Sequence, residues 1–399
     1  KFAGPAIEDT IIDSNEGYSG IYGEYGSAPI ITDCVISNNI SPNNSGGGLR
    51  LDNSNGYMSN LQTRISDTTF LSNEGYWGGG AYLRNANAVF EGCDFVSNTA
   101  DVGGGLNTIG GTQTFINGTF TSNNAGQGGA IYANSQLTLQ NCTISGNESD
   151  TNGGGMVTSR DTFIYNCVVS GNSATGAPGA PGSGGGIHAG NSTTVIHNST
   201  ICGNYASYHG GGLTFWAGSS LVNSIVRGNL SGAGWYDNIQ GTPTVTWSNI
   251  EGGFAGTGNM DVPALFINPR PPAEAPTTAG DYHLQETSPC IDAGSNADVP
   301  AWLVEDMDGD DRIMDGDGDT IPDVDMGADE VPPPSDCEQD LDGDGDVDGA
   351  DAAIFITDFG RTDCDTGPPC QGDFNGDFAV DETDLARFAS DFGREDCLD

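Results

Sequence analysis

The chain has 399 residues, and its 55 Asp and Glu residues against 11 Lys and Arg residues give a formal net charge of −44. So strong a negative charge excludes the basic surface that binds nucleic acid or an anionic membrane. No apolar stretch approaches the roughly 18 residues of a membrane span, so we expect no direct membrane insertion. Glycine is abundant at 62 residues, but 36% of the residues are hydrophobic, which indicates a folded protein.

A short phrase that ends in asparagine repeats along the first part of the chain. Its first copy is Cys34-Val-Ile-Ser-Asn-Asn39, and glycine runs such as Gly78-Gly-Gly-Ala81 separate successive copies. Self-similarity at a nearly fixed period indicates a solenoid, in which each repeat forms one coil. The closing asparagines are 24 to 34 residues apart, and they are Asn39, Asn73, Asn98, Asn123, Asn147, Asn172, Asn204 and Asn229.

Each repeat predicts short strands and no helix. The positions five and three before the asparagine are small or cysteine and then Phe, Ile or Val, which is the alternation of a strand with one inward face. The Leu-x-x-Leu-x-Leu frame of leucine-rich repeats is missing. We therefore expect a parallel β-helix, with the asparagine in left-handed geometry at one tight corner and the glycines at another.

Five cysteines of the repeats fall on two faces of the predicted strands. Cys34, Cys93, Cys142 and Cys167 occupy the same inward position, where we expect them to pack as small buried hydrophobic residues. Cys202 lies two residues before its asparagine and therefore on the opposite face. We expect Cys202 to be the free or reactive thiol of the repeats.

The repeat fades after about residue 245, and Pro-rich and acidic segments follow. We expect β-helix repeats over residues 1–268 and the end of the β-helix, with an Asp-rich calcium loop, over 269–331. A Pro-rich linker over 332–336 then leads to a separate module over 337–399. The acidic residues gather at this end, because 34 of the 55 lie in residues 291–399.

The segment 306–325 carries a carboxylate at almost every second residue. When such a chain loops, the carboxylate oxygens point toward a common centre, which suits Ca²⁺ with its six to eight oxygen ligands. A solvated acidic loop is the alternative, but its like charges would repel one another. We expect Ca²⁺ to bind Asp306, Asp308, Asp310, Asp315, Asp317, Asp319, Asp323 and Asp325.

Two 12-residue segments near the C-terminus match the ligand frame of an EF-hand loop. Position 12 is Asp in both, instead of the usual Glu, and position 7 ligates through its backbone carbonyl, so an alanine is acceptable there. Each segment leads into a short predicted helix that ends at a glycine. We expect Ca²⁺ ligands at Asp340, Asp342, Asp344, Asp346, Asp348 and Asp351, and at Asp373, Asn375, Asp377, Ala379, Asp381 and Asp384.

Residues 337–399, with paired loops and helices that repeat after 33 residues, resemble a type I dockerin, a module that docks onto cohesin domains. Four cysteines keep the same period. They pair either as Cys337–Cys397 with Cys364–Cys370 or within each repeat, and both choices imply an exported, oxidising setting. The first residues lack the features of a signal peptide, so we expect that any export signal has been removed.

Residues 1 to about 330 resemble bacterial right-handed parallel β-helix surface proteins. The phrases that carry the resemblance include Asp281-Tyr-His-Leu284, Ser288-Pro-Cys-Ile-Asp-Ala-Gly294 and Asp325-Met-Gly-Ala328. The two resemblances together imply an all-β right-handed parallel β-helix followed by a small α-helical dockerin-like calcium module. They also imply a secreted or cell-surface location, but no particular chemistry.

We expect no catalytic site. A polysaccharide lyase of this fold typically needs a Lys or Arg base, but the one lysine is Lys1 and the arginines are scattered over different repeats. The function that we expect is a secreted calcium-binding structural or adhesive rod. Residues 337–399 would join it to other copies of itself or to a cohesin-like protein, with surface glycans as possible further ligands. A dockerin-bearing carbohydrate-active enzyme or a glycan-binding module is the alternative.

Overall fold

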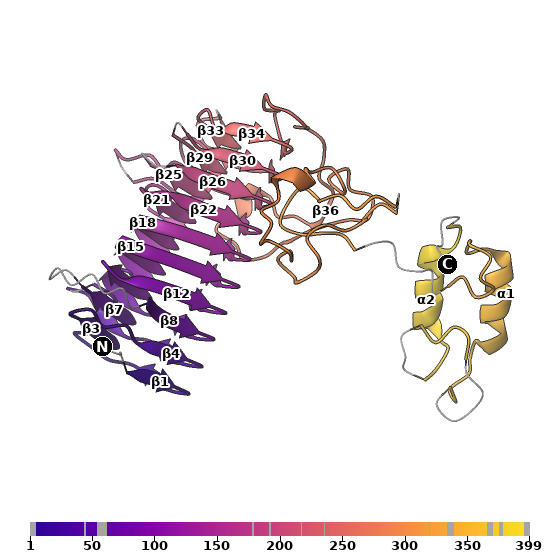
Figure 1. Cartoon of the computed structure of the whole chain (residues 1–399), viewed down its shortest axis with the longest axis horizontal. Coiled ribbons are helices and arrows are strands. Elements are labelled where there is room, and N and C mark those ends of the chain that lie inside the picture. Colours follow the sequence, from indigo (N-terminus) through magenta and orange to yellow (C-terminus); the bar gives the residue numbers. More distant parts are fainter. Residues whose placement is uncertain are drawn as a thin grey trace. The chain divides into compact units, whose positions relative to one another are not determined.

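The computed structural model divides the chain into two compact units, Lys1–Val331 and Pro332–Asp399 (Figure 1). The first unit is built of short strands, and the second contains two helices. Among the described residues, no helix is long and apolar enough to cross a membrane. The structure describes residues 5–43, 45–53, 62–177, 179–190, 193–216, 218–234, 236–318, 320–332, 339–364, 370–374 and 378–394.

The first unit winds its chain into a solenoid of stacked coils, as Figure 1 shows. Each strand pairs in parallel with the equivalent strand of the next coil. In β13 (Asp94–Val96), for example, Phe95 aligns with Phe70 of the coil before and with Phe120 of the coil after. The prediction of a parallel β-helix is therefore confirmed.

The coils build three parallel sheets within the described part of the chain. The largest sheet takes two strands from most coils and consists of β1 (Ala6–Glu8), β3 (Ile21–Glu24), β4 (Ile30–Thr32), β7 (Leu49–Asp52), β8 (Gln62–Ser66), β11 (Ala81–Arg84), β12 (Asn87–Glu91), β15 (Leu106–Ile116), β18 (Ile131–Gln140), β21 (Met156–Thr158), β22 (Thr162–Tyr165), β25 (Ile187–Ala189), β26 (Thr194–His197), β29 (Leu213–Thr214), β30 (Ser220–Val222), β33 (Ile239–Gln240) and β34 (Thr244–Thr246). The ten-stranded sheet consists of β2 (Ile11–Asp13), β5 (Val35–Ser37), β9 (Thr69–Leu71), β13, β16 (Thr119–Thr121), β19 (Thr143–Ser145), β23 (Val168–Ser170), β27 (Thr200–Cys202), β31 (Ile225–Arg227) and β35 (Asn249–Ile250). The eight-stranded sheet consists of β6 (Ile40–Ser41), β10 (Glu74–Trp77), β14 (Thr99–Val102), β17 (Asn124–Gln127), β20 (Glu148–Ser149), β24 (Ser173–Ala174), β28 (Tyr205–Ala206) and β32 (Leu230–Ser231).

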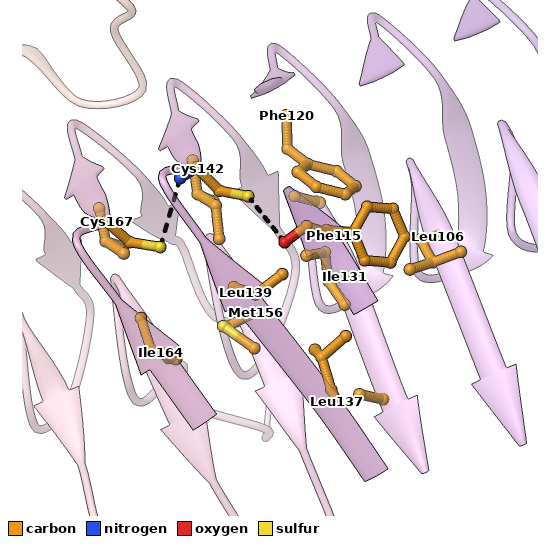
Figure 2. Packing of buried hydrophobic residues seen from close by; sticks show 14 of the residues in the cluster. Leu106, Phe115, Phe120, Ile131, Leu137, Leu139, Cys142, Met156, Ile164 and Cys167 are labelled. Carbon is orange, nitrogen blue, oxygen red and sulfur yellow. Dashed lines mark hydrogen bonds between the residues drawn. The ribbon is translucent and has the colours of Figure 1, made fainter. Parts of the chain in front are cut away.

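The interior of the coils is filled by the inward side chains of the strands. Phe70, Phe95 and Phe120 stack in successive coils, with ring centroids 4.5 and 4.8 Å apart. Cys142 and Cys167 occupy equivalent positions in neighbouring coils of the same interior (Figure 2). All four cysteines of the inward column are buried, as the sequence predicted. Each large apolar side chain buried in this way stabilises the fold by about 1.5–3 kcal/mol.

The closing asparagines form a hydrogen-bonded ladder inside the coils. The Oδ1 atom of Asn147 accepts hydrogen bonds from the backbone N–H of Asn123 at 2.9 Å and from its side-chain Nδ2 at 3.0 Å. The Nδ2 atom of Asn147 donates to Oδ1 of Asn172 at 2.9 Å and to the backbone carbonyl of Phe120 at 2.8 Å. The same pattern joins the other closing asparagines, all of which are buried.

The left-handed residue at this corner is the one before the asparagine, so the predicted position was wrong by one residue. Ser122 has a φ of 56° and Gly146 has a φ of 63°, whereas Asn123 and Asn147 lie outside the left-handed region. Strand alternation alone would point the residue before the asparagine inward. The left-handed turn shifts this alternation by one residue, and the asparagine side chain then points into the coil and reaches its neighbours.

The glycine runs form a second corner, as predicted. Gly78 has a φ of 66°, and a Cβ atom at this position would lie only 2.0 Å from the carbonyl oxygen of Ala81. A Cβ atom on Gly79 would lie 2.5 Å from the carbonyl oxygen of Gly104 in the next coil. Glycine is therefore needed both for its left-handed backbone and for the close approach of successive coils.

The last strand of the parallel ladder is β35, and an isolated parallel bridge joins its Asn249 to Met260. The chain then forms a side layer, which we define as residues 260–331. This layer adds no further coil to the solenoid. It contains β36 (Phe266–Asn268), η1 (Pro272–Glu274), β37 (Asp281–Leu284) and η2 (Asn296–Asp298), and β36 pairs antiparallel with β37.

The side layer covers part of the outer face of the ten-stranded sheet. Val168, Cys202 and Ile225 of this sheet pack in one buried cluster with Phe266 and Tyr282 of the side layer. Cys202 is only 3% exposed, and burial raises the pKa of its thiol to about 12. Cys202 is a free thiol, as predicted, but it is not an exposed reactive one, because the side layer buries the residue that strand alternation points outward.

The second unit packs two helices of matching sequence, α1 (Gly349–Asp358) and α2 (Glu382–Asp391). Phe355 of α1 stacks on Phe388 of α2 with ring centroids 5.1 Å apart. These rings form the core of the unit together with two valines from the loops that precede the helices.

The same two backbone bonds occur twice in this unit. Val347 donates its N–H to the carbonyl of Arg394 at 2.9 Å and accepts a hydrogen bond from the N–H of Gly393 at 2.7 Å. Val380, which is 33 residues later, exchanges the equivalent bonds of 2.8 and 2.7 Å with the segment that follows α1. Each repeat therefore holds the other, which gives the unit an approximate internal two-fold symmetry.

Replacing one rung of the asparagine ladder should destabilise the coils. In an Asn147→Leu variant, buried groups of the neighbouring coils lose their partners, at a cost of about 1–3 kcal/mol for each unpaired group. Denaturant unfolding followed by circular dichroism measures this loss. The matched control is Asn124→Leu, because Asn124 is exposed one residue beyond the ladder. Equal losses in the two variants would contradict the ladder.

The burial of Cys202 predicts its chemical reactivity. In the native protein, iodoacetamide should leave Cys202 unmodified, because its thiol is both covered and protonated. A Phe266→Ala variant opens the side layer and should increase labelling of Cys202 but not of Cys93, which lies inside the coils. Peptide mapping by mass spectrometry gives both rates. Rapid labelling of Cys202 in the unmodified native protein would show that the side layer does not cover it.

Candidate metal centres

The first acidic loop, residues 340–351, curls around the carboxylate of Asp340. Its Oδ1 atom accepts hydrogen bonds from the backbone N–H groups of Gly343 at 2.8 Å and Asp344 at 3.2 Å. Its Oδ2 atom accepts a hydrogen bond from Gly345 at 2.9 Å. Gly343 and Gly345 both have positive φ, so the local sequence permits the tight curvature of the loop.

The start of α1 fixes the other end of this loop. Asp348 is the N-cap residue of α1 and forms a capping box with Asp351. Asp351 is fully buried. Its Oδ2 atom accepts a hydrogen bond from the N–H of Asp348 at 2.8 Å, and its Oδ1 atom accepts one from Leu341 at 2.7 Å. Both ends of the loop therefore position this one carboxylate.

The carboxylates of the first acidic loop converge. Ligand atoms of Asp340, Asp342 and Asp351 lie within 4.8 Å of one another, and so do those of Asp346, Asp348 and Asp351. Desolvation and the neighbouring carboxylates raise the pKa of Asp342 and of Asp346. The Oδ1 atom of Asp346 is buried and has no hydrogen-bond partner among the described residues. A centre of oxygen ligands with an unsatisfied carboxylate fits a hard cation such as Ca²⁺.

The described residues of the second acidic loop, which spans residues 373–384, repeat the hydrogen bonds that hold the first loop to its helix. The Oδ1 atom of Asp384 accepts a hydrogen bond from Phe374 at 2.9 Å, and its Oδ2 atom accepts one from Asp381, the N-cap of α2, at 2.9 Å. The Oδ1 atom of Asp373 is buried without a hydrogen-bond partner in the described part of the loop. The remaining predicted ligands are Ala379, which the structure describes, and Asn375 and Asp377, which lie outside the described residues.

A disulfide joins Cys364 and Cys370 between the two repeats of the second unit, with an S–S distance of 2.01 Å. This bond belongs to the first of the two predicted pairings and excludes pairing within each repeat. Cys337 and Cys397 lie outside the described residues, so their predicted pairing remains a prediction.

The described aspartates of segment 306–325 in the first unit lie in several different places. Asp306 is fully buried, and its Oδ1 atom accepts hydrogen bonds from the backbone N–H groups of residues 308–310 at 2.9–3.0 Å. Its Oδ2 atom accepts a hydrogen bond from the backbone N–H of Glu330 at 2.8 Å. These backbone bonds hold a turn around the Asp306 carboxylate and connect it to the segment at Glu330.

Asp325 is also buried and belongs to a charged cluster in the side layer. Its carboxylate accepts hydrogen bonds from the backbone N–H groups of Asp292 at 2.7 Å and Val331 at 2.9 Å. Burial raises its pKa to about 7. The buried Arg312 lies nearby and pairs with Glu330 at 2.9 Å. Asp325 and Asp306 therefore connect parts of the side layer, and their assignment as calcium ligands stays a prediction.

The other predicted ligands of this segment separate into different places. Asp315 and Asp317 form a group with Asp292, in which ligand atoms lie within 4.8 Å of one another. Burial, followed by the charges of these two carboxylates, raises the pKa of Asp292 to about 6. The rest are Asp308, which lies beside His283 and Asp329; Asp310, which is exposed; Asp323, which accepts a hydrogen bond from Asn296; and Asp319, which lies outside the described residues.

The sequence did not indicate three residues that the fold places beside these carboxylates, namely Asp292, His283 and Asp329. His283 and Asp292 lie in the phrases that begin at Asp281 and Ser288, but those phrases indicated only a family resemblance. No local spacing connects them to residues 306–325, because the contacts are made across the side layer.

Comparison with known proteins agrees with the coiled structure. Residues 47–231 match the family model that describes the right handed beta helix region. No curated protein and no solved structure matches the chain. The matched segment runs from β7 to β32 and ends before the side layer. The match and the parallel coils together support a right-handed parallel β-helix for the repeats of the first unit.

Proposed function

We propose that this protein is a Ca²⁺-binding structural protein, whose β-helical rod is attached to, or polymerised into, an extracellular assembly by its second unit. The observation that carries the proposal is the pair of acidic loops, in each of which a buried aspartate at the start of a helix is bonded to both ends of its loop. The stacked coils of the first unit are consistent with a structural or surface rod. The disulfide of the second unit supports a location outside the reducing cytosol.

The two acidic loops would hold Ca²⁺ through oxygen atoms alone. The ligands proposed for the first loop are Asp340, Asp342, Asp344, Asp346, Asp348 and Asp351. In the second loop, Asp373, Asp381, Asp384 and the carbonyl of Ala379 would contribute, together with Asn375 and Asp377. The bound ion supplies the positive charge that offsets the mutual repulsion of these carboxylates.

Exposed apolar residues on the helices support a docking role for the second unit. Ile356 of α1 is 68% exposed and Leu385 of α2 is 44% exposed. Phe359 and Phe392, which are related by the internal two-fold symmetry, are also exposed. Apolar side chains that remain at the surface of so acidic a unit favour contact with another protein. The proposed partner is a cohesin-like domain or another copy of this chain.

Removal of Ca²⁺ should unfold the second unit before the first. Binding to the folded state alone adds about 4 kcal/mol of stability when free Ca²⁺ exceeds Kd a thousandfold. Calorimetry should therefore show two transitions, of which excess EGTA lowers only that of the second unit. Asp351→Asn should have the same effect in the presence of Ca²⁺.

The matched control for this experiment is Asp363→Asn, because Asp363 lies outside the loops and pairs only with the partly exposed Arg361 in the described part of the unit. It removes the same charge but should leave the response to Ca²⁺ unchanged. If EGTA leaves both transitions and the protease resistance of the second unit unchanged, the calcium assignment is wrong.

Assembly should require the second unit and Ca²⁺. The full chain should form oligomers in Ca²⁺, or bind an added cohesin domain, and deletion of residues 332–399 should leave folded monomers. Ile356→Asp should weaken the association about tenfold or more. Ile267→Asp, at an exposed position of β36, should not. Analytical ultracentrifugation distinguishes these cases. A different result would favour the enzyme alternative. In that case the full chain in Ca²⁺ would stay monomeric, bind no cohesin domain and depolymerise an acidic polysaccharide.

A further inference from the structure

A histidine and three carboxylates meet on the surface of the side layer. In β37, Tyr282 and Leu284 point into the buried cluster, so Asp281 and His283 point outward. Asp308 belongs to the turn around Asp306. Three segments that are separate in the sequence therefore contribute to this place.

The imidazole of His283 is held at both of its nitrogen atoms. The Nδ1 atom lies 2.5 Å from Oδ1 of Asp281, and the Nε2 atom lies 2.9 Å from Oδ2 of Asp308. Ligand atoms of His283, Asp308 and Asp329 all lie within 4.8 Å of one another. The ring is half exposed, so an ion in solution can reach Nε2.

Asp329 brings a buried carboxylate to this group. It is only 9% exposed, and its Oδ2 atom accepts one backbone hydrogen bond, from Leu284 at 3.2 Å. A buried carboxylate is costly unless a positive charge lies near it. A neutral imidazole does not supply this positive charge. The carboxylates therefore need either a proton on the ring or a bound cation.

We propose that Nε2 of His283, together with Asp308 and Asp329, binds a divalent transition metal ion of the Zn²⁺ class. An imidazole nitrogen suits Zn²⁺ and its neighbours, whereas Ca²⁺ and Mg²⁺ take oxygen ligands. Asp281 supplies the partner that metal-bound histidines commonly have, a carboxylate on the other ring nitrogen that fixes the tautomer. Three protein ligands leave a fourth tetrahedral position for water.

One pair of ligand atoms needs only a small adjustment to accept the ion, and the other pairs, which lie within 4.8 Å, would move to the same spacing. Bonds of about 2.0–2.1 Å in a tetrahedral site separate the ligand atoms by roughly 3.3 Å. The Nε2–Oδ2 contact of 2.9 Å between His283 and Asp308 would lengthen by a few tenths of an ångström. Binding replaces the proton on Nε2 with the metal ion, and this proton is released to solvent. The ion would then connect β37 to the turns at Asp308 and Asp329.

This site is independent of the proposed Ca²⁺ loops and is tested on the full chain with those loops saturated by Ca²⁺. The probe is Co²⁺, because its visible absorption reports tetrahedral coordination and nitrogen ligation, followed by displacement with Zn²⁺. The native chain should bind one equivalent with a tetrahedral spectrum that Zn²⁺ abolishes. His283→Gln and Asp329→Asn should each lose this spectrum.

Two further variants separate the site from general effects. His209→Gln removes a histidine elsewhere in the coils and should leave the spectrum and the affinity unchanged. Asp281→Asn removes the positioning carboxylate and should weaken Co²⁺ binding roughly 10–100-fold while the spectrum at saturation remains tetrahedral. The melting temperature of each metal-free variant shows whether it is folded.

Two results would overturn the proposal. The first is a native chain that gives no tetrahedral Co²⁺ spectrum, in which case His283 and its carboxylates form an ion-pair network only. The second is a folded His283→Gln variant that binds Co²⁺ with the native spectrum, because the ligand set must then lie elsewhere.

Discussion

The hydrogen-bonded asparagine ladder is the interaction on which the first unit depends. Each buried amide bonds to the coils before and after it, so neighbouring coils can stack in only one register. A slip by one residue would bury a backbone polar group without a partner, at a cost comparable to a large fraction of a domain's stability. Once the register is fixed, each residue of a coil lies beside the equivalent residue of the next coil. Phenylalanines, cysteines and glycines therefore stack in separate columns.

The ladder fixes the interior of the solenoid but leaves its outer faces open. Where the outer face of the ten-stranded sheet is apolar, at Val168, Cys202 and Ile225, the chain covers it with the side layer. This layer has few regular elements, and buried charges hold it together. Arg312 and Glu330 form an ion pair that is almost fully buried, and removing one partner of such a pair leaves an uncompensated charge. Part of the acidity of this segment therefore stabilises the fold of the side layer.

The two acidic segments of the chain differ for a physical reason. In the first acidic loop of the second unit, the carboxylates lie within twelve residues that lead into a helix N-terminus, so local hydrogen bonds suffice to bring the oxygens together. Segment 306–325 has a similar density of aspartates but no helix to close it. There, Asp308 lies beside His283 and Asp329, and Asp315 and Asp317 lie beside Asp292, so these carboxylates meet residues of the surrounding layer.

The sequence by itself determined the period, the inward columns of phenylalanine and cysteine, the glycine corner and the acidic loops, because each of these depends on spacing along a few consecutive residues. The sequence could not show that the residue before the asparagine has the left-handed backbone. This position depends on tertiary contacts, because the asparagine amide must point inward to reach the next coil. Only the tertiary structure decided that Cys202 is covered and that His283 meets Asp308 and Asp329. These contacts join segments that are separate in the sequence, and they depend on where the side layer packs against the coils.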